Sequence, residues 1–283
     1  GNMLGLGTHQ QPRIEAQLAY AYDRFVVERI LPGDSRIKTL LYLPLNEPDQ
    51  CIRIIEEFGE TPGVLGFMVT SVRFKPVHHN AYIPIYRMLE ERGLPLAFHA
   101  GPNWTDDYMK QLDLFISMHA ISFVLCNMVH LTNWIIQGMP ERFPRLKVIW
   151  IESGVAWISF MMQRLDSEYL MRSSEAPLLK KLPSEYMRDM FFSSQPIETS
   201  NLALLEATMT AMKAETQMLY ASDWPHWDFN PPSTIYDLPF LDDAAKRRFK
   251  TVVVFKLDRA FRSVKDMHDT LAVWDALGIS FKS

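Results

Sequence analysis

The sequence predicts a single α/β domain built on parallel strands. Short apolar runs alternate with amphipathic helical segments along most of the chain, which is the pattern of consecutive β-α-β units. No internal repeat, low-complexity tract or interdomain linker interrupts this alternation. The 283 residues are enough for one large domain with a substantial core, so we expect one domain over residues 1–283.

Six apolar runs have the length of buried strands, and we expect these strands near residues 37–45, 63–70, 95–99, 147–151, 190–194 and 218–221. Helical periodicity predicts helices over 13–31, 47–58, 82–92, 112–138, 156–170, 184–188 and 201–212. Pro32-Gly33 ends the first helix and Gly93 ends the third. Pro231 and Pro232 lead into a last helical region, whereas the apolar run 252–255 in the tail to residue 283 has no place in this pattern.

Composition and charge exclude several classes of protein. Hydrophobic residues make up 48% of the chain and charged residues 22%, and the net charge is −4 with no basic cluster for nucleic acid or membrane. We expect no membrane span, because no apolar stretch approaches the ~18 residues that one needs. No secretion signal is evident, and Cys51 and Cys126 lack metal or disulfide spacing, so we expect a cytoplasmic protein with reduced thiols.

Groups able to bind a metal or transfer a proton stand at the ends of three predicted strands. Asp223 follows the run 218–221, His99 ends the run 95–99, and Glu152 follows the run 147–151. Because the carboxyl ends of parallel strands share one edge of the sheet, these side chains are expected to meet there. The sequence therefore predicts one site built by these residues.

The motifs around these residues resemble those of the amidohydrolase-2 family of metal-dependent hydrolases and non-oxidative decarboxylases. The resemblance runs from about residue 36 to 248 and rests on the segments 94–101, 141–157, 164–166 and 220–228. It implies a distorted (β/α)₈ barrel, usually dimeric, with one divalent metal, commonly zinc. His99 would match the fifth-strand ligand and Asp223 the eighth-strand carboxylate. The six strands would then be the third to eighth, with the first two and their His pair absent from this sequence.

Each proposed ligand has an alternative role that is structural and involves no metal. Asp223 would bind the metal and move a proton, or else cap the turn that follows it. His99 would bind through a neutral ring nitrogen, or else be a buried histidine bonded to backbone. Glu152 stands where the family commonly has a His. It would be a ligand, a base or an orienter of His99, or else a carboxylate at a helix start.

Further candidates surround this predicted site. His119, in the helix after His99, would shuttle protons or contact substrate, unless it is an ordinary helix histidine. Side chains expected to bind a flat, carboxylate-bearing substrate are Arg73, Trp104, Trp224 and His226. Arg73 is otherwise an exposed loop residue.

These residues predict a metal-dependent enzyme acting on a small carboxylate-bearing or aromatic molecule. We expect a hydrolase that uses water activated by one Zn²⁺, or Mn²⁺ in its place, with Asp223 as proton carrier. The same residues would also serve a non-oxidative decarboxylase of an aromatic or muconate-like acid. A catalytically inactive barrel that binds a small ligand is the third alternative. Homodimers are common in the family, and we expect one here.

Overall fold

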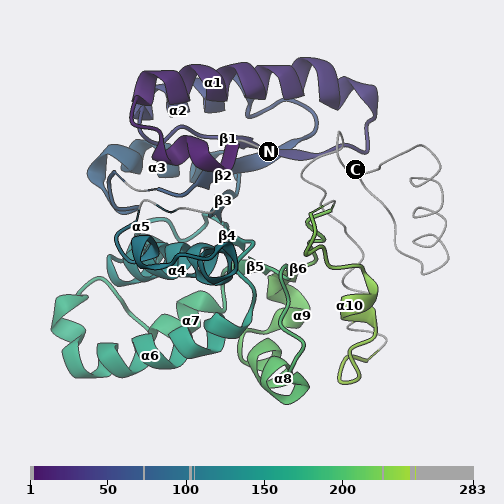
Figure 1. Cartoon of the computed structure of the whole chain (residues 1–283). Coiled ribbons are helices and arrows are strands. Elements are labelled where there is room, and N and C mark those ends of the chain that lie inside the picture. Colours follow the sequence, from purple (N-terminus) through teal and green to yellow (C-terminus); the bar gives the residue numbers. More distant parts are fainter. Residues whose placement is uncertain are drawn as a thin grey trace.

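A computed structural model describes residues 3–72, 74–101, 104, 106–224, 226–242 and 246. Within these residues the chain forms a parallel sheet of six strands in the order β1-β2-β3-β4-β5-β6. Figure 1 shows the strands following one another, with helices of the connecting segments packed beside them. The expected α/β fold with six parallel strands is confirmed, while Arg73 and the tail after residue 246 lie outside the described residues.

The strands are β1 Thr39–Tyr42, β2 Val64–Thr70, β3 Leu96–His99, β4 Val148–Ile151, β5 Phe191–Ser193 and β6 Met218–Leu219. The α-helices are α1 Pro12–Phe25, α2 Pro48–Phe58, α3 Ile83–Glu91, α4 Phe115–Ile136, α5 Met139–Arg142, α6 Ala156–Arg172, α7 Pro183–Met187, α8 Leu202–Ala211, α9 Ala214–Gln217 and α10 Ser233–Tyr236. Shorter helical segments are η1 Met3–Thr8, η2 Val26–Ile30, η3 Leu31–Gly33, η4 Asn80–Tyr82, η5 Met109–Gln111 and η6 Ser173–Glu175. The first predicted helix thus ends as an α-helix at Phe25 and continues as the π-helical turn η2.

Both faces of the sheet are buried, which explains why its strands read as continuous apolar runs. One face packs against the helices through large side chains, and Phe98 stacks on Trp150 with ring centroids 4.8 Å apart. The opposite face carries a second apolar cluster that includes Met68, Ala97 and Ile151. Residues of one strand therefore contribute alternately to the helix-covered core and to the inner face.

The strand register brings the expected site residues to one edge of the sheet. His99, the last residue of β3, is paired with Thr70 of β2 on one side and Ile151 of β4 on the other. Ser193 of β5 is likewise paired with Leu219 of β6. The residues that follow Ile151 and Leu219 therefore leave the sheet beside His99.

Helix α1 covers the outer strand β1 and buries two carboxyl groups there. Glu15 and Asp23 are both fully buried. The Tyr42 hydroxyl donates a hydrogen bond to Glu15, and the Tyr42 backbone N–H donates one to Asp23 Oδ1 at 3.0 Å. Asp23 Oδ2 has no hydrogen-bond partner among the described residues. Burial raises the pKa of Asp23 well above its ordinary value, against the lowering effect of the bond from Tyr42.

Asp23→Asn is expected to flatten the dependence of stability on pH. Because the folded protein holds a proton on Asp23 that the unfolded chain releases, stability contributed by this proton is complete below about pH 4 and is lost as the pH rises. Asparagine stays neutral and can accept the same bond from Tyr42. The free energy of unfolding, measured with urea at several pH values, should fall less steeply in the variant, by up to about 1.4 kcal/mol per pH unit. Equal slopes for the two proteins would contradict this assignment.

Helix α4 overturns the expectation that no apolar stretch approaches membrane-spanning length. Its 22 residues are long and apolar enough to cross a bilayer by length and composition, and it alone meets this test in the described part of the chain. Core helices of globular domains pass the same test, and the C-terminal half of α4 packs as one. Leu131, Trp134 and Ile135 are buried in the main core, and the Trp134 ring contacts Phe98 edge to face at 5.6 Å.

Candidate active site

His99 is buried at the end of β3 with both ring nitrogens engaged. Nδ1 donates to the backbone carbonyl of Ala100, which fixes the ring and turns Nε2 toward Glu152. Nε2 lies 2.6 Å from Glu152 Oε2. Burial alone would lower the pKa of His99, but the negative charge of Glu152 and its hydrogen bond raise the pKa overall. The contact with Glu152 therefore favours the protonated form of the His99 ring.

Glu152 is held in a backbone conformation that disfavours most side chains. Its φ is 56°, and its backbone N–H donates to Ser193 Oγ at 2.9 Å. Gly154, two residues on, has a φ of 68°, and a Cβ there would clash with the Glu198 carboxylate. Glu198 in turn accepts hydrogen bonds from Val155 and Ala156 at the start of α6. This close turn directs the Glu152 side chain back to His99, at a cost of order 1–3 kcal/mol for the left-handed residue.

Asp223 lies four residues beyond β6 and also has a left-handed backbone, with a φ of 54°. His226 Nδ1 is 2.6 Å from Asp223 Oδ2, but it lies out of line for a hydrogen bond. This buried oxygen has no aligned donor among the described residues. Burial, and secondly the charge of Glu152, raise the pKa of Asp223 to about 7, although His226 acts to lower it.

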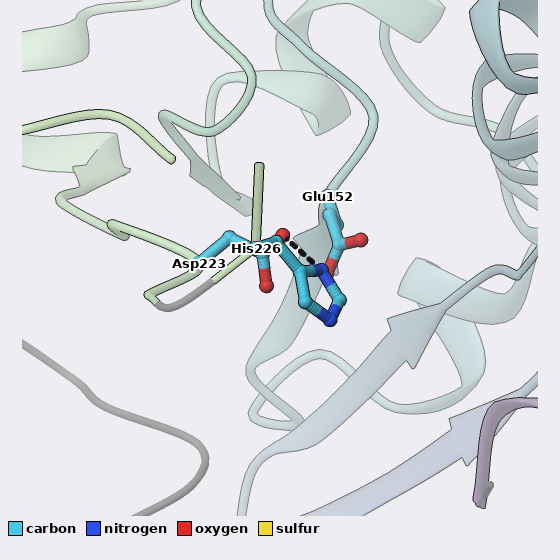
Figure 2. Close-up of side chains that lie close together, drawn as sticks. All are labelled: Glu152, Asp223 and His226. Atoms are coloured by element: carbon cyan, nitrogen blue, oxygen red, sulfur yellow. Dashed lines mark ion pairs between the residues drawn. The ribbon is translucent and has the colours of Figure 1, made fainter. Parts of the chain in front are cut away.

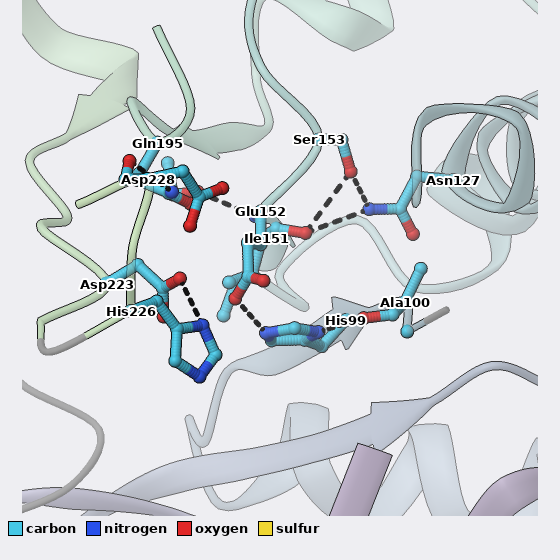
Figure 3. A network of polar contacts seen from close by, with 12 residues as sticks. His99, Ala100, Asn127, Ile151, Glu152, Ser153, Gln195, Asp223, His226 and Asp228 are labelled. Atoms are coloured by element: carbon cyan, nitrogen blue, oxygen red, sulfur yellow. Dashed lines mark hydrogen bonds and ion pairs between the residues drawn. The ribbon is translucent and has the colours of Figure 1, made fainter. Parts of the chain in front are cut away.

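These side chains fit a divalent cation. Ligand atoms of Glu152, Asp223 and His226 all lie within 4.8 Å of one another. Figure 2 shows the three side chains close together. Figure 3 places His99 on the other side of Glu152, with its ring turned toward the same group. Two features of these residues are typical of metal ligands. Asp223 has a buried oxygen without an aligned hydrogen-bond donor, and Nδ1 of His99 is bonded to a backbone carbonyl. Glu152, Asp223 and His226 would be ligands, and His99 would join them if its Nε2 exchanged Glu152 for the cation.

The structure places the remaining candidates at varying distances from this cluster. His119 Nε2 lies 4.0 Å from Asp228 Oδ2, and the His119 ring lies 5.1 Å from that of Trp227, so helix α4 meets the loop that carries Asp223. Trp224 packs edge to face on Phe229 at 4.5 Å. Trp104 is exposed, and Arg73 lies outside the described residues. The catalytic and substrate-binding roles of these residues stay predictions.

Two features of the site were not expected from the sequence. His226 was expected to meet an anionic substrate, but it lies with the acids as a potential ligand. Its spacing of three residues from Asp223 was the available signal. Asp228, which faces His119 and whose backbone carbonyl accepts from Gln195 Nε2 at 3.4 Å, was not singled out at all. No local pattern marks it, since its neighbours come from distant segments.

The amidohydrolase-2 family model matches residues 4–251. The chain belongs to this family of enzymes. Among curated proteins, the chain is 18% identical over 248 residues to the gamma-resorcylate decarboxylase of a Polaromonas species, covering 83% of this chain and 75% of the relative.

Solved structures of other proteins share the fold of this chain. A dihydroxybenzoic acid decarboxylase from Polaromonas sp. JS666, with bound manganese and 2-nitroresorcinol, matches with a TM-score of 0.68 and 16% identity over 84% of this chain and 74% of that one. A 5-carboxyvanillate decarboxylase from Novosphingobium aromaticivorans, with manganese and a nitrobenzoic acid, matches with a TM-score of 0.73 and 20% identity, over 87% and 70% of the two chains. The α/β fold is therefore a partial TIM barrel like that of these decarboxylases, as expected.

The comparisons correct the expected activity, and they show which metal two of the relatives hold. The prediction of a hydrolase is wrong, because these relatives are decarboxylases of aromatic acids. The prediction depended on Glu152 standing where a His is common, and that substitution does not discriminate between two reactions that use the same ligands. The two solved relatives hold manganese, where zinc was the first expectation here.

Proposed function

We propose that this protein is a manganese-dependent, non-oxidative decarboxylase of small hydroxylated aromatic acids. The observation that carries the proposal is the convergence of His99, Glu152 and Asp223 at the carboxyl ends of the sheet, in a chain similar to decarboxylases of such acids. Two carboxylates among the ligands favour Mn²⁺, which prefers oxygen donors more than Zn²⁺ does.

Substrate binding in this proposal depends on charge. A bound divalent cation would offset the negative charge of Glu152 and Asp223 and attract the substrate carboxylate. His99 keeps its orientation through the bond to the Ala100 carbonyl, so the ligand geometry is set before substrate arrives. The aromatic side chains of Trp224 and Trp227 lie in the same loop as Asp223 and would bound a planar ring.

Decarboxylation requires a proton at the ring carbon that bears the carboxylate. Asp223 is the residue that we assign to this step, because a carboxylate beside the cation can take up a proton and pass it to a substrate carbon. Its pKa of about 7 belongs to the site without a cation, and a bound cation would lower that pKa. Asp223 would donate its proton to that carbon, the carbon–carboxyl bond would break, and its electron pair would restore the aromatic ring as CO₂ leaves. Solvent would then return a proton to Asp223.

The purified protein with Mn²⁺ is expected to release CO₂ and the matching phenol in equal amounts from 2,6-dihydroxybenzoate or 5-carboxyvanillate. Substrate loss is followed by absorbance, and both products are quantified. A chelator should abolish turnover, and added Mn²⁺ should restore it. A protein shown to bind one equivalent of Mn²⁺ that releases no CO₂ from hydroxylated benzoic acids would overturn the proposal.

A further inference from the structure

A cavity lies outside the candidate active site. It has a volume of about 420 Å³ and is enclosed by α4 together with segments that follow β2 and β3. None of His99, Glu152 and Asp223 lines it. Side chains on its wall include Val72 and Met109, which are apolar, and Lys75, which is cationic. This volume is in the range of small organic ligands.

A thiol and an imidazole meet on the wall of this cavity. Cys126 Sγ lies 3.3 Å from His130 Nε2, and the two residues are one helical turn apart on α4. With its own proton on Nδ1, His130 can accept the thiol proton at Nε2. The thiolate is the nucleophilic form of cysteine, and a neighbouring imidazole is a common way to produce it. The proposed decarboxylation uses neither residue.

A hydroxyl without a partner stands beside this pair. Ser122 also lines the cavity, one helical turn before Cys126, and is only 2% exposed. Its Oγ has no hydrogen-bond partner among the described residues. A buried donor without an acceptor is costly, about 1–3 kcal/mol, unless a ligand supplies the missing oxygen. The cavity therefore offers a nucleophile, a base and a hydrogen-bond donor on one helix face.

We propose that Cys126 is a covalent modification site for small α,β-unsaturated carbonyl compounds. The thiol proton passes to His130 Nε2, and the sulfur forms a bond to the β-carbon of the compound. The electron pair of the carbon–carbon double bond shifts toward the carbonyl, whose oxygen accepts a hydrogen bond from Ser122. The resulting enolate takes the proton back from His130, which leaves a thioether and no change in the number of electrons.

Cys51 provides a control within the same chain. It is fully buried in the main core between helix and sheet, and it lines no cavity described above. Burial, the largest effect, raises the pKa of its thiol well above the ordinary value. The sequence contains only these two cysteines, so the fate of each can be read separately.

Modification of Cys126 would also affect the candidate metal site. Cys126 packs against Ala100 and Phe123, and the Ala100 carbonyl holds Nδ1 of His99. An adduct on the sulfur would press on these neighbours and so disturb His99. This consequence rests on the proposed function, whereas the modification itself does not.

The test is reaction of the folded protein with N-ethylmaleimide, followed by intact mass measurement and peptide mapping. Cys126 is expected to react at least about tenfold faster than Cys51, since only its thiol has a base and an open cavity beside it. His130→Gln should slow Cys126 by about tenfold or more, and Ser122→Ala by a smaller factor. Val129→Ala changes the same wall without touching the thiol and should leave the rate unaltered.

Equal rates at Cys126 and Cys51 in the wild-type protein would overturn the proposal without any variant. An unchanged Cys126 rate in a folded His130→Gln protein, checked by circular dichroism, would overturn the role of the imidazole. Titration of the modified protein with Mn²⁺ tests the link to His99 separately. Modification at Cys126 with unaltered Mn²⁺ affinity would overturn that link alone.

Discussion

Asp223→Asn is expected to lower the rate of CO₂ release by about 1000-fold, since the variant loses both an anionic ligand and the proton donor. The asparagine cannot carry an exchangeable acidic proton to the ring carbon, although it has nearly the same size. The decrease should appear in kcat at saturating Mn²⁺ and substrate. Asp237→Asn, an exposed acid after α10, is the matched control and should stay close to wild type.

The same variant should be more stable than the wild-type protein when no metal is present. The folded pKa of Asp223 is about 7, above its unfolded value, so its contribution to stability is complete below about pH 4 and is lost as the pH rises to about 7. At pH 8 the gain from Asp223→Asn is about 2 kcal/mol, after allowance for a side chain that is 18% exposed. A variant that keeps activity, or one that unfolds more easily at pH 8, would contradict the role of Asp223.

Hydrophobic patterning was sufficient to predict the sheet but not every helix boundary. All six expected strands are present because parallel strands buried on both faces need uninterrupted apolar runs such as 64–70 and 148–151. The first helix was expected to continue to Leu31, but it changes to a π-helical turn at Val26, and periodicity does not distinguish the two. The apolar length of helix α4 was underestimated because its polar residues Asn127 and His130 are themselves buried.

The candidate site was predictable in its members but not in its geometry. His99, Glu152 and Asp223 could be assigned because each follows a strand and parallel strands share an edge. The left-handed backbone at Glu152 and Asp223 could not be predicted from the sequence, because non-glycine residues adopt it only when surrounding contacts enforce it. Those contacts, such as the one from Glu152 to Ser193, join residues that are 41 positions apart in the sequence. The grouping of His226 with the acids depends on the same loop conformation.

Glu152→Gln is expected to weaken Mn²⁺ binding by about 10- to 100-fold, because a neutral amide replaces a carboxylate beside the cation. Isothermal titration calorimetry measures this change directly, and Glu168→Gln on the surface of α6 is the control for loss of a carboxylate elsewhere. The variant should also lower two pKa values in the metal-free protein. His99 would keep the penalty of burial without its partner, and Asp223 would lose the neighbouring negative charge that raises its pKa.

These pKa changes separate two roles for Glu152. If the carboxylate binds the cation, affinity falls and the pH dependence of Mn²⁺ binding shifts to lower pH, since protons compete less well for Asp223 and His99. If Glu152 only orients His99, a glutamine that still bonds to Nε2 through its carbonyl preserves affinity, and only the titrations of His99 and Asp223 in the metal-free protein move. Unchanged affinity would therefore remove Glu152 from the ligands and leave His99, Asp223 and His226 to hold the metal.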